Sequence, residues 1–332
     1  MSARAERLED PGLLDAFAAP ADWTPVGSRE LAQTAADATF VVREGGSLLA
    51  RCSAWWRSAP PLEGERVAVV GHFAATDATS ARLVLDAAVE AARAAGATIV
   101  LGPMDGNTWR RYRFVVDRGT EPQFLLEPWN PAEWPEWWRA AGWTKHSEYI
   151  SAANEDLSVA DPGAEEKARA MEARGVRLRT LDLARYDEEL GSIHEVARVS
   201  FARNYLYTPL DEASFRAQYG PARAIVQPEL VTLAEHHGRC VGFFFAVPNV
   251  LEAQRGERIR SAIAKTFAVL PDYRGLGAVL AQRTHERARA LGFRRVIHAL
   301  IHVGNDRSRA LSNRTAREIR RYALFERRLT AR

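Results

Sequence analysis

The stretch Phe267–Val279, with the sequence FAVLPDYRGLGAV, constrains the fold more than any other part of this chain. An apolar run typical of a β-strand ends at a Pro-Asp-Tyr turn, and an Ala- and Leu-rich helical segment then runs to Gly292. Between them, Gly275 and Gly277 open a loop at the positive end of the helix dipole. The loop suits a pyrophosphate, because glycine lets an anion approach the backbone N–H groups. The two glycines alone would equally suit a plain tight turn.

The residues around this loop resemble the acyl-CoA-binding motif of the GNAT acetyltransferase superfamily. That motif, Q/R-x-x-G-x-G/A, follows a strand that ends in V-x-P. Residues 269–271 match V-x-P, and Arg274 and Gly277 match the first four positions of the motif. Val279 departs from the pattern, because the family usually has Gly or Ala at that position.

The resemblance implies which residues hold an acyl-CoA. In this family a strand splayed away from its neighbour offers backbone N–H groups to the acyl carbonyl and the pantetheine arm. A second cofactor element, N-x-x-A-x-x-L-Y-x-x-x-G, resembles residues 305–316 of this chain. The expected cofactor-binding residues are therefore Phe267, Ala268, Val269, Arg274, Gly275, Leu276, Gly277, Ala278, Val279, Asn305 and Ser308.

The catalytic groups are less sharply indicated. Acyl transfer to an amine needs a base for the ammonium and a proton donor for the departing thiolate. Ser312 stands where the family has its proton-donating tyrosine, and a hydroxyl is a much poorer acid than a phenol. We predict Ser312, Glu235 and His302 as catalytic residues and Tyr205 and Tyr207 as acceptor-pocket residues. Tyr273 or Tyr322 is an alternative proton donor, and His236, His237 or His298 is an alternative base. It is also open that residues 235–237 are only an exposed hairpin end and that Ser312 only faces solvent, so that neither has a catalytic role.

The C-terminal half has the element order of one GNAT domain. Periodicity predicts these elements: strands over 176–183, 230–236, 240–247, 261–270, 295–303 and 318–329, and helices over 188–204, 211–219, 276–291 and 306–316. The N-terminal half repeats the plan, with strands over 38–42, 47–54, 66–74, 98–101 and 146–152 and helices over 79–95 and 137–143. Its equivalent turn, residues 74–81, contains no glycine, so we expect this half not to hold CoA.

We therefore predict an α/β fold of two GNAT-like domains in tandem, each an α+β mixed sheet that is twisted and flanked by helices. The expected boundaries are 1–152 for a degenerate GNAT-like domain, 153–175 for a linker with a short helix, and 176–332 for the acyl-CoA-binding catalytic domain. All nine tryptophans precede residue 144, and five lie within residues 129–143. They predict an aromatic subcore or, alternatively, an aromatic wall that faces the other domain.

Charge and cysteine usage narrow the class of protein. Residues 271–332 hold 15 arginines, no lysine and five acidic residues, a net charge of +10, whereas the whole chain carries +3. This basic end suits a ligand with several phosphates or a nucleic acid. Cys52 and Cys240 lie far apart and favour a reduced cytoplasmic setting, and Cys240 with His236 lacks further partners for a metal site. The N-terminus has no apolar signal-peptide core, and no run of 18 apolar residues predicts a membrane span.

The sequence thus predicts a cytoplasmic acyltransferase that uses acetyl-CoA, or another acyl-CoA, to acylate the amine of a small-molecule acceptor, without a metal. We expect the protein to be a monomer or a homodimer. We expect no membrane partner, and nucleic acid is disfavoured as a partner but stays open. Two other functions stay open: a catalytically weak acyl-CoA-binding protein, and an aminoacyl-tRNA-dependent transferase with a doubled GNAT fold. A Rossmann nucleotide site is disfavoured, because Leu280 stands where a third glycine would be needed.

Overall fold

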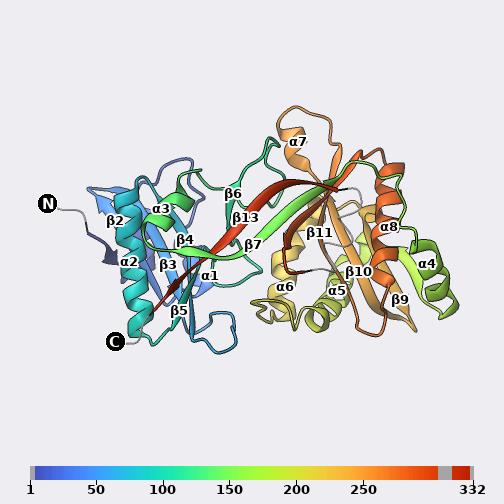
Figure 1. Ribbon diagram of the computed structural model, residues 1–332, viewed down its shortest axis with the longest axis horizontal. Coiled ribbons are helices and arrows are strands. Elements are labelled where there is room, and N and C mark those ends of the chain that lie inside the picture. Colours follow the sequence, from blue (N-terminus) through green and yellow to red (C-terminus); the bar gives the residue numbers. More distant parts are fainter. Residues whose placement is uncertain (1–3, 306–315, 330–332) are drawn as a thin grey trace.

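In the computed structural model, the chain forms one long mixed sheet with helices packed against it (Figure 1). The structure describes residues 4–305 and 316–329. The N-terminal elements are β1 (Glu6–Arg7), η1 (Pro11–Ala16), α1 (Ser28–Thr34), β2 (Ala38–Glu44), β3 (Ser47–Trp55), β4 (Val67–Ala75), α2 (Ala78–Ala94), β5 (Ile99–Gly102), β6 (Phe114–Asp117), α3 (Trp134–Ala140) and β7 (Thr144–Asn154). The C-terminal elements are α4 (Ala164–Ala173), β8 (Arg177–Thr180), η2 (Leu183–Arg185), α5 (Tyr186–Ser200), α6 (Glu212–Tyr219), η3 (Gly220–Ala224), η4 (Pro228–Leu230), β9 (Val231–His236), β10 (Arg239–Pro248), α7 (Val250–Gln254), β11 (Ser261–Val269), α8 (Leu276–Ala290), β12 (Arg295–His302) and β13 (Ala316–Arg328).

Most of the predicted elements form within a few residues of their expected bounds. Helix α6 begins as expected, since the Asp211 carboxylate caps it by accepting a hydrogen bond from the Ser214 backbone N–H at 2.8 Å. Strand β6 and helix α7 were not predicted, because each has only four or five residues and too little periodicity to register. The helix expected over 306–316 falls, apart from its last residue, outside the described residues. None of the described helices is long and apolar enough to cross a bilayer.

The two halves exchange their last strands. The order along the sheet is β1-β2-β3-β4-β5-β13-β7-β12-β11-β10-β9-β8, with β6 beside β13. Strand β7, from the N-terminal half, therefore pairs with β12, and β13 ends against β5. Figure 1 shows β13 and β7 running side by side from one half of the molecule into the other. The predicted boundaries at residues 152 and 175 stay a prediction, but the pairing makes the halves interdependent.

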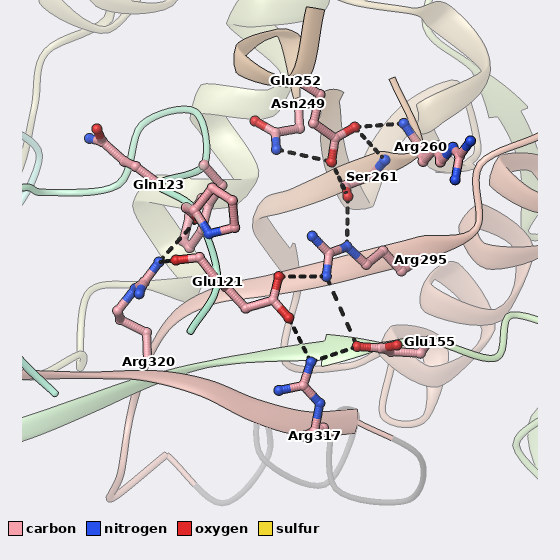
Figure 2. Close-up of polar contacts among 12 residues, drawn as sticks. Glu121, Gln123, Glu155, Asn249, Glu252, Arg260, Ser261, Arg295, Arg317 and Arg320 are labelled. Carbon is pink, nitrogen blue, oxygen red and sulfur yellow. Dashed lines mark hydrogen bonds and ion pairs between the residues drawn. The ribbon is translucent and has the colours of Figure 1, made fainter. Parts of the chain in front are cut away.

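Arginines of the basic C-terminal end are paired with acidic residues from earlier in the chain. Figure 2 shows part of this network, in which Glu121 accepts hydrogen bonds from Arg295 and Arg317. In the same network, the ion pair between Arg320 and Glu127 is fully buried, at 2.8 Å. The arginines that pair with acids before residue 166 are Arg283, Arg295, Arg317, Arg320, Arg321 and Arg328. Much of the charge that the sequence suggested for a polyphosphate ligand instead joins the two halves.

The tryptophan-rich region is mainly core. Trp134, Trp138 and Trp143 belong to the N-terminal hydrophobic core, where Trp138 packs edge-on against Phe73 and Phe114. This agrees with the subcore interpretation. Trp109 is different, because its indole N–H donates to the Thr208 carbonyl at 2.7 Å and its ring packs against Phe201, directly after α5, and Phe215 of α6.

Candidate functional site

The C-terminal half of the sheet splits between two parallel strands. Strands β11 and β12 pair only from Ser261 to Ala264 on one side and from Arg295 to His298 on the other. Beyond Ala264, β11 stays paired with β10 as far as Val269. On its other edge, β11 is no longer paired with β12. Phe267, Ala268 and Val269 lie in this unpaired part. Their position is the one predicted for residues that offer backbone hydrogen bonds to an acyl group.

A bulge marks the point of divergence. Phe245 of β10 pairs with Thr266, whereas the next residue, Ala246, pairs with Ala264, so Lys265 is an extra residue in β11. A bulge changes the direction of a strand and is common beside binding sites.

The predicted phosphate loop follows directly. Gly275 has φ 92° and precedes the first residue of α8, a conformation that disfavours a side chain. A Cβ atom on Gly277 would lie 3.8 Å from the Phe267 ring and 3.9 Å from Val269, so this glycine faces the unpaired end of β11. The start of α8 therefore packs against side chains from the part of β11 that has left β12.

The side chains of the motif divide between surface and core. Leu276 and Val279 are almost fully buried in the cluster beneath α8, so their side chains are not available to a ligand. The Leu276 N–H donates to the Tyr273 carbonyl at 3.1 Å. Val279, which replaces the small residue of the family motif, packs its side chain into this cluster. Asn305 is the last residue of the turn that follows β12, and its backbone N–H donates to the His302 carbonyl. Ser308 and Ser312 lie outside the described residues, so their predicted roles stay predictions.

Helix α4 contributes cations that the sequence did not single out. The aliphatic part of Lys167 lies 3.4 Å from the Cβ position of Gly275. Arg174 donates to the Asp272 carbonyl at 3.3 Å and lies over the Tyr273 ring. Lys167 of α4 and Arg174 directly after it thus lie beside the predicted phosphate loop, in addition to Arg274.

Glu235 lies away from the split in the sheet. It is on β9, which is separated from β12 by β10 and β11. Its carboxylate accepts a hydrogen bond from Arg179 at 2.8 Å, and the same guanidinium pairs with Glu189. The structure therefore does not bring Glu235 to His302, and an ion pair occupies it. The alternative base His236 is bonded through Nδ1 to the Tyr273 hydroxyl at 2.7 Å.

His302 and Tyr205 are brought together at the mouth of the split. Their rings are 5.1 Å apart, and the Tyr149 ring lies 4.9 Å from His302 on another side. Burial and the nearby charge of Arg113 lower the pKa of His302, so its ring is neutral at neutral pH. Its Nδ1 accepts a hydrogen bond from the Gly304 N–H at 3.0 Å, which leaves the proton on Nε2. In this tautomer His302 is a hydrogen-bond donor rather than a free base.

A second histidine, His146 on β7, completes the group. Its Nδ1 donates to the Glu326 carboxylate at 2.5 Å, and its Nε2 accepts a hydrogen bond from the Tyr205 hydroxyl. Glu326 reaches this position because β13 is exchanged into the N-terminal half. Burial raises the pKa of Tyr205 to about 12. The arrangement is a carboxylate–imidazole–phenol relay, in which Glu326 orients the imidazole and leaves Nε2 to take a proton.

The other predicted tyrosines have structural surroundings. Tyr207 packs against the Trp109 ring, with the ring centres 6.0 Å apart, and not within the relay. Tyr322 is buried and donates to Glu127 at 2.5 Å, and burial raises its pKa above the usual range. Tyr322 is therefore part of the buried ion-pair network, which argues against the alternative that it protonates a thiolate.

Lys265 lies close to Arg113 at the same junction. Arg113 donates to the Leu300 carbonyl at 3.0 Å and its guanidinium lies 4.0 Å from the centre of the Tyr149 ring. Burial, together with the positive charge of Arg113, lowers the pKa of Lys265 to about 8. The bulge thus carries an amine that can be neutral at mildly alkaline pH.

This amine gives a pH-dependent stability. Because the folded pKa lies below the unfolded value, the cost of burying the ammonium is fully present below pH 8 and is lost as pH rises toward the unfolded pKa. Lys265→Met should therefore raise the melting temperature at pH 7, and the difference from wild type should shrink by pH 10. Thermal unfolding at both pH values measures this. An equal shift at the two values would show that the ammonium is not penalised.

The comparisons with known proteins agree with this geometry. Residues 191–314 match the acetyltransferase (GNAT) family. The tandem GNAT protein from the clavulanic acid biosynthesis pathway superposes with a TM-score of 0.52 over 100% of both chains, at 15% identity. The GCN5-related glucosamine N-acetyltransferase region of a fungal β-N-acetylglucosaminidase gives 0.54 over 98% of this chain and 38% of that chain, at 13% identity. Residues 191–314 of the C-terminal half thus match the GNAT family, as the motif predicted, and the whole chain has the fold of a tandem GNAT protein.

One curated relative adds a second comparison. The bacterial ceramide synthase of Caulobacter vibrioides is 26% identical over 217 residues, which are 64% of this chain. The matched region spans 56% of that relative's length.

Sequence reasoning missed the relay and its surroundings. His146, Glu326 and Arg113 carry no motif, and they come together only through the exchange of β7 and β13. The one local signal was the pair of tyrosines after α5, of which Tyr205 joins the relay.

Proposed function

We propose that this protein is an N-acyltransferase that moves an acyl group from acyl-CoA to an amine bound where the two halves meet. The observation that carries the proposal is the divergence of β11 from β12 immediately before the glycine loop of α8. That divergence leaves one edge of β11 available to the acyl carbonyl, while the loop and the cations of α4 suit the diphosphate.

The relay supplies the proton chemistry that the reaction requires. The amine attacks the thioester carbonyl, the C–S bond breaks, and the nitrogen loses a proton while the thiolate gains one. His146, oriented by Glu326, accepts a proton through the Tyr205 hydroxyl. Proton return along the same path neutralises the thiolate. Ser312 remains a second candidate for that last step.

The relative favours a lipid amine as acceptor. A ceramide is the amide of a fatty acid and a long-chain amino alcohol, so a ceramide synthase joins an acyl group to an amine. This is the reaction type proposed here, and it favours a long acyl donor over acetyl. The direct test is incubation with acetyl-, hexanoyl- and palmitoyl-CoA and either sphinganine or a polyamine, with thiol release and amide mass as readouts. Amide formation only from sphinganine supports the lipid acceptor, and thiol release without any amide contradicts the transferase.

Two other functions have their own tests. A protein that only binds acyl-CoA would be stabilised by it but would release no thiol above background. An aminoacyl-tRNA-dependent transferase would bind tRNA with a steep dependence on salt. Many arginines of the C-terminal end are already paired with acidic residues, so their charge favours neither an acyl-CoA-binding protein nor a tRNA-dependent transferase.

The relay predicts matched losses of activity. Tyr205→Phe and His146→Gln should each lower kcat by about 100-fold, since each removes general acid–base catalysis. The double variant should lose little more than either single variant, because the two groups act as one unit. Tyr186→Phe, which removes a buried hydroxyl bonded to the Tyr219 carbonyl, is the matched control and should keep wild-type kcat. Full activity in both relay variants would remove the relay from the mechanism.

A further inference from the structure

The N-terminal half contains a polar cluster at the place that corresponds to the acyl site of the other half. Strands β4 and β5 are parallel and pair only from Val67 to Val69 and from Ile99 to Leu101. Beyond Val69, β4 leaves β5 but stays paired with β3 as far as Ala75. His72 lies in this part, where the pairing with β3 shifts register, and has φ 49°, an uncommon conformation for a residue other than glycine.

Three potential ligand side chains converge there from separate elements. They are Glu30 on α1, His72 on β4 and Asp105 in the loop after β5, and one ligand atom of each lies within 4.8 Å of the other two. The His72 Nε2 atom is 3.7 Å from the Glu30 carboxylate. This is too long for a hydrogen bond, but it is close to the spacing of two ligands on one ion with bonds of about 2.1 Å.

The hydrogen bonds of His72 leave Nε2 as a lone pair. Nδ1 lies 3.1 Å from the Ser53 hydroxyl, which also contacts Thr39, so Nδ1 can hold its proton toward an oxygen acceptor. Nε2 is buried and has no hydrogen-bond partner in the described part of the chain. Two carboxylates and one imidazole lone pair therefore face one another.

We propose that Glu30, His72 and Asp105 bind a divalent transition-metal cation such as Zn²⁺. An imidazole nitrogen and two carboxylate oxygens are a donor set that such ions accept. The bond from Nδ1 to Ser53 is the outer contact that fixes the imidazole for a metal. The sequence predicted no metal site, because these three residues are 42 and 33 positions apart in succession and share no spacing motif.

The surroundings give the ion access and limit its affinity. A cavity of about 50 Å³ lined by His72, Asp105 and Arg51 adjoins the cluster, and the Glu30 side chain is 37% exposed. Arg111 lies 3.9 Å from the Asp105 carboxylate. Its positive charge opposes a cation and balances the carboxylates when no ion is bound.

The site would also connect the two halves of the molecule. The loop that holds Asp105 continues to Arg113, whose guanidinium bonds to Leu300 at the proposed acceptor site. An ion that joins α1, β4 and this loop would hold Arg113 in place.

Calorimetric titration of the EDTA-treated full chain with ZnCl₂ tests the proposal, with MgCl₂ as a comparison. We expect one Zn²⁺ per chain and no comparable Mg²⁺ binding. Glu30→Gln, at a partly exposed position where folding is not at risk, should weaken Zn²⁺ binding by tenfold or more. Ser53→Ala should weaken it by about tenfold, as the loss of an outer contact does. Arg111→Gln should tighten it, because a repelling charge is removed.

The controls separate this site from surface binding. Glu63→Gln removes an exposed carboxylate, and His237→Asn removes an exposed imidazole beside His236. Both should bind Zn²⁺ like wild type. The proposal is overturned if wild type binds no Zn²⁺, if Glu30→Gln binds as tightly as wild type, or if His237→Asn abolishes binding. Weaker binding in Arg111→Gln would also contradict a cation site.

Discussion

Gly277→Asp should abolish the thermal stabilisation that acyl-CoA gives to this protein. The new carboxylate would lie beside Phe267 and Val269, on the surface where the start of α8 meets the open edge of β11. There it would repel and displace the diphosphate. A carboxylate in the first turn of a helix is favourable to the helix itself, so the fold should persist. Differential scanning fluorimetry with and without acyl-CoA measures the effect.

Gly277→Ala is the matched control for that prediction. The nearest atoms to its Cβ would be 3.8 and 3.9 Å away, which is ordinary van der Waals contact. The alanine variant should keep most of the stabilisation, because it adds no charge. If the aspartate variant were stabilised as strongly as wild type, the diphosphate would have to bind elsewhere.

Arg320→Met should destabilise the chain by about 3–5 kcal/mol. The substitution leaves Glu127 buried without its cation, and an uncompensated buried charge is costly. Arg320 is on the exchanged strand β13, and Glu127 belongs to the loop before α3. The loss of this ion pair should therefore weaken the packing between the two halves. Urea denaturation of wild type and variant gives the free energy of unfolding.

Two further variants identify the cause of the loss. Arg320→Met combined with Glu127→Gln should recover much of the stability, because the buried charge is gone. Arg321→Met, on the next residue, removes exposed ion pairs with Glu148 and Glu318 and should cost at most about 1 kcal/mol. Equal losses from Arg320→Met and Arg321→Met would mean that the buried pair has no special weight.

The sequence predicted the parts of the site that depend on local chemistry. A strand, a glycine turn and a helix follow one another within residues 267–290, and their period and turn residues are visible without any long-range contact. Asp211 was a predictable helix cap for the same reason. The glycine turn between β11 and α8 could therefore be placed from the sequence, whereas its role in binding phosphate stays a prediction.

What could not be predicted depends on pairing between distant segments. The alternation of β7 and β13 fits a strand in either half, so periodicity does not reveal that these strands are exchanged. Glu326 and His146 are 180 residues apart and become neighbours only through that exchange. Glu235 was expected to act as a catalytic residue, but its carboxylate forms an ion pair with Arg179, which lies 56 positions earlier in the chain. The excess of arginine at the C-terminus was read as ligand-binding charge, because its acidic partners lie elsewhere in the chain.

The most direct test of the account is a crystal structure of the chain with a non-hydrolysable acyl-CoA analogue. The account predicts that the diphosphate lies against the backbone at Gly275 and Gly277 and that the pantetheine arm runs between β11 and β12 toward Tyr205. Density for the analogue in the N-terminal half, or none in a crystal soaked at saturating concentration, would contradict it.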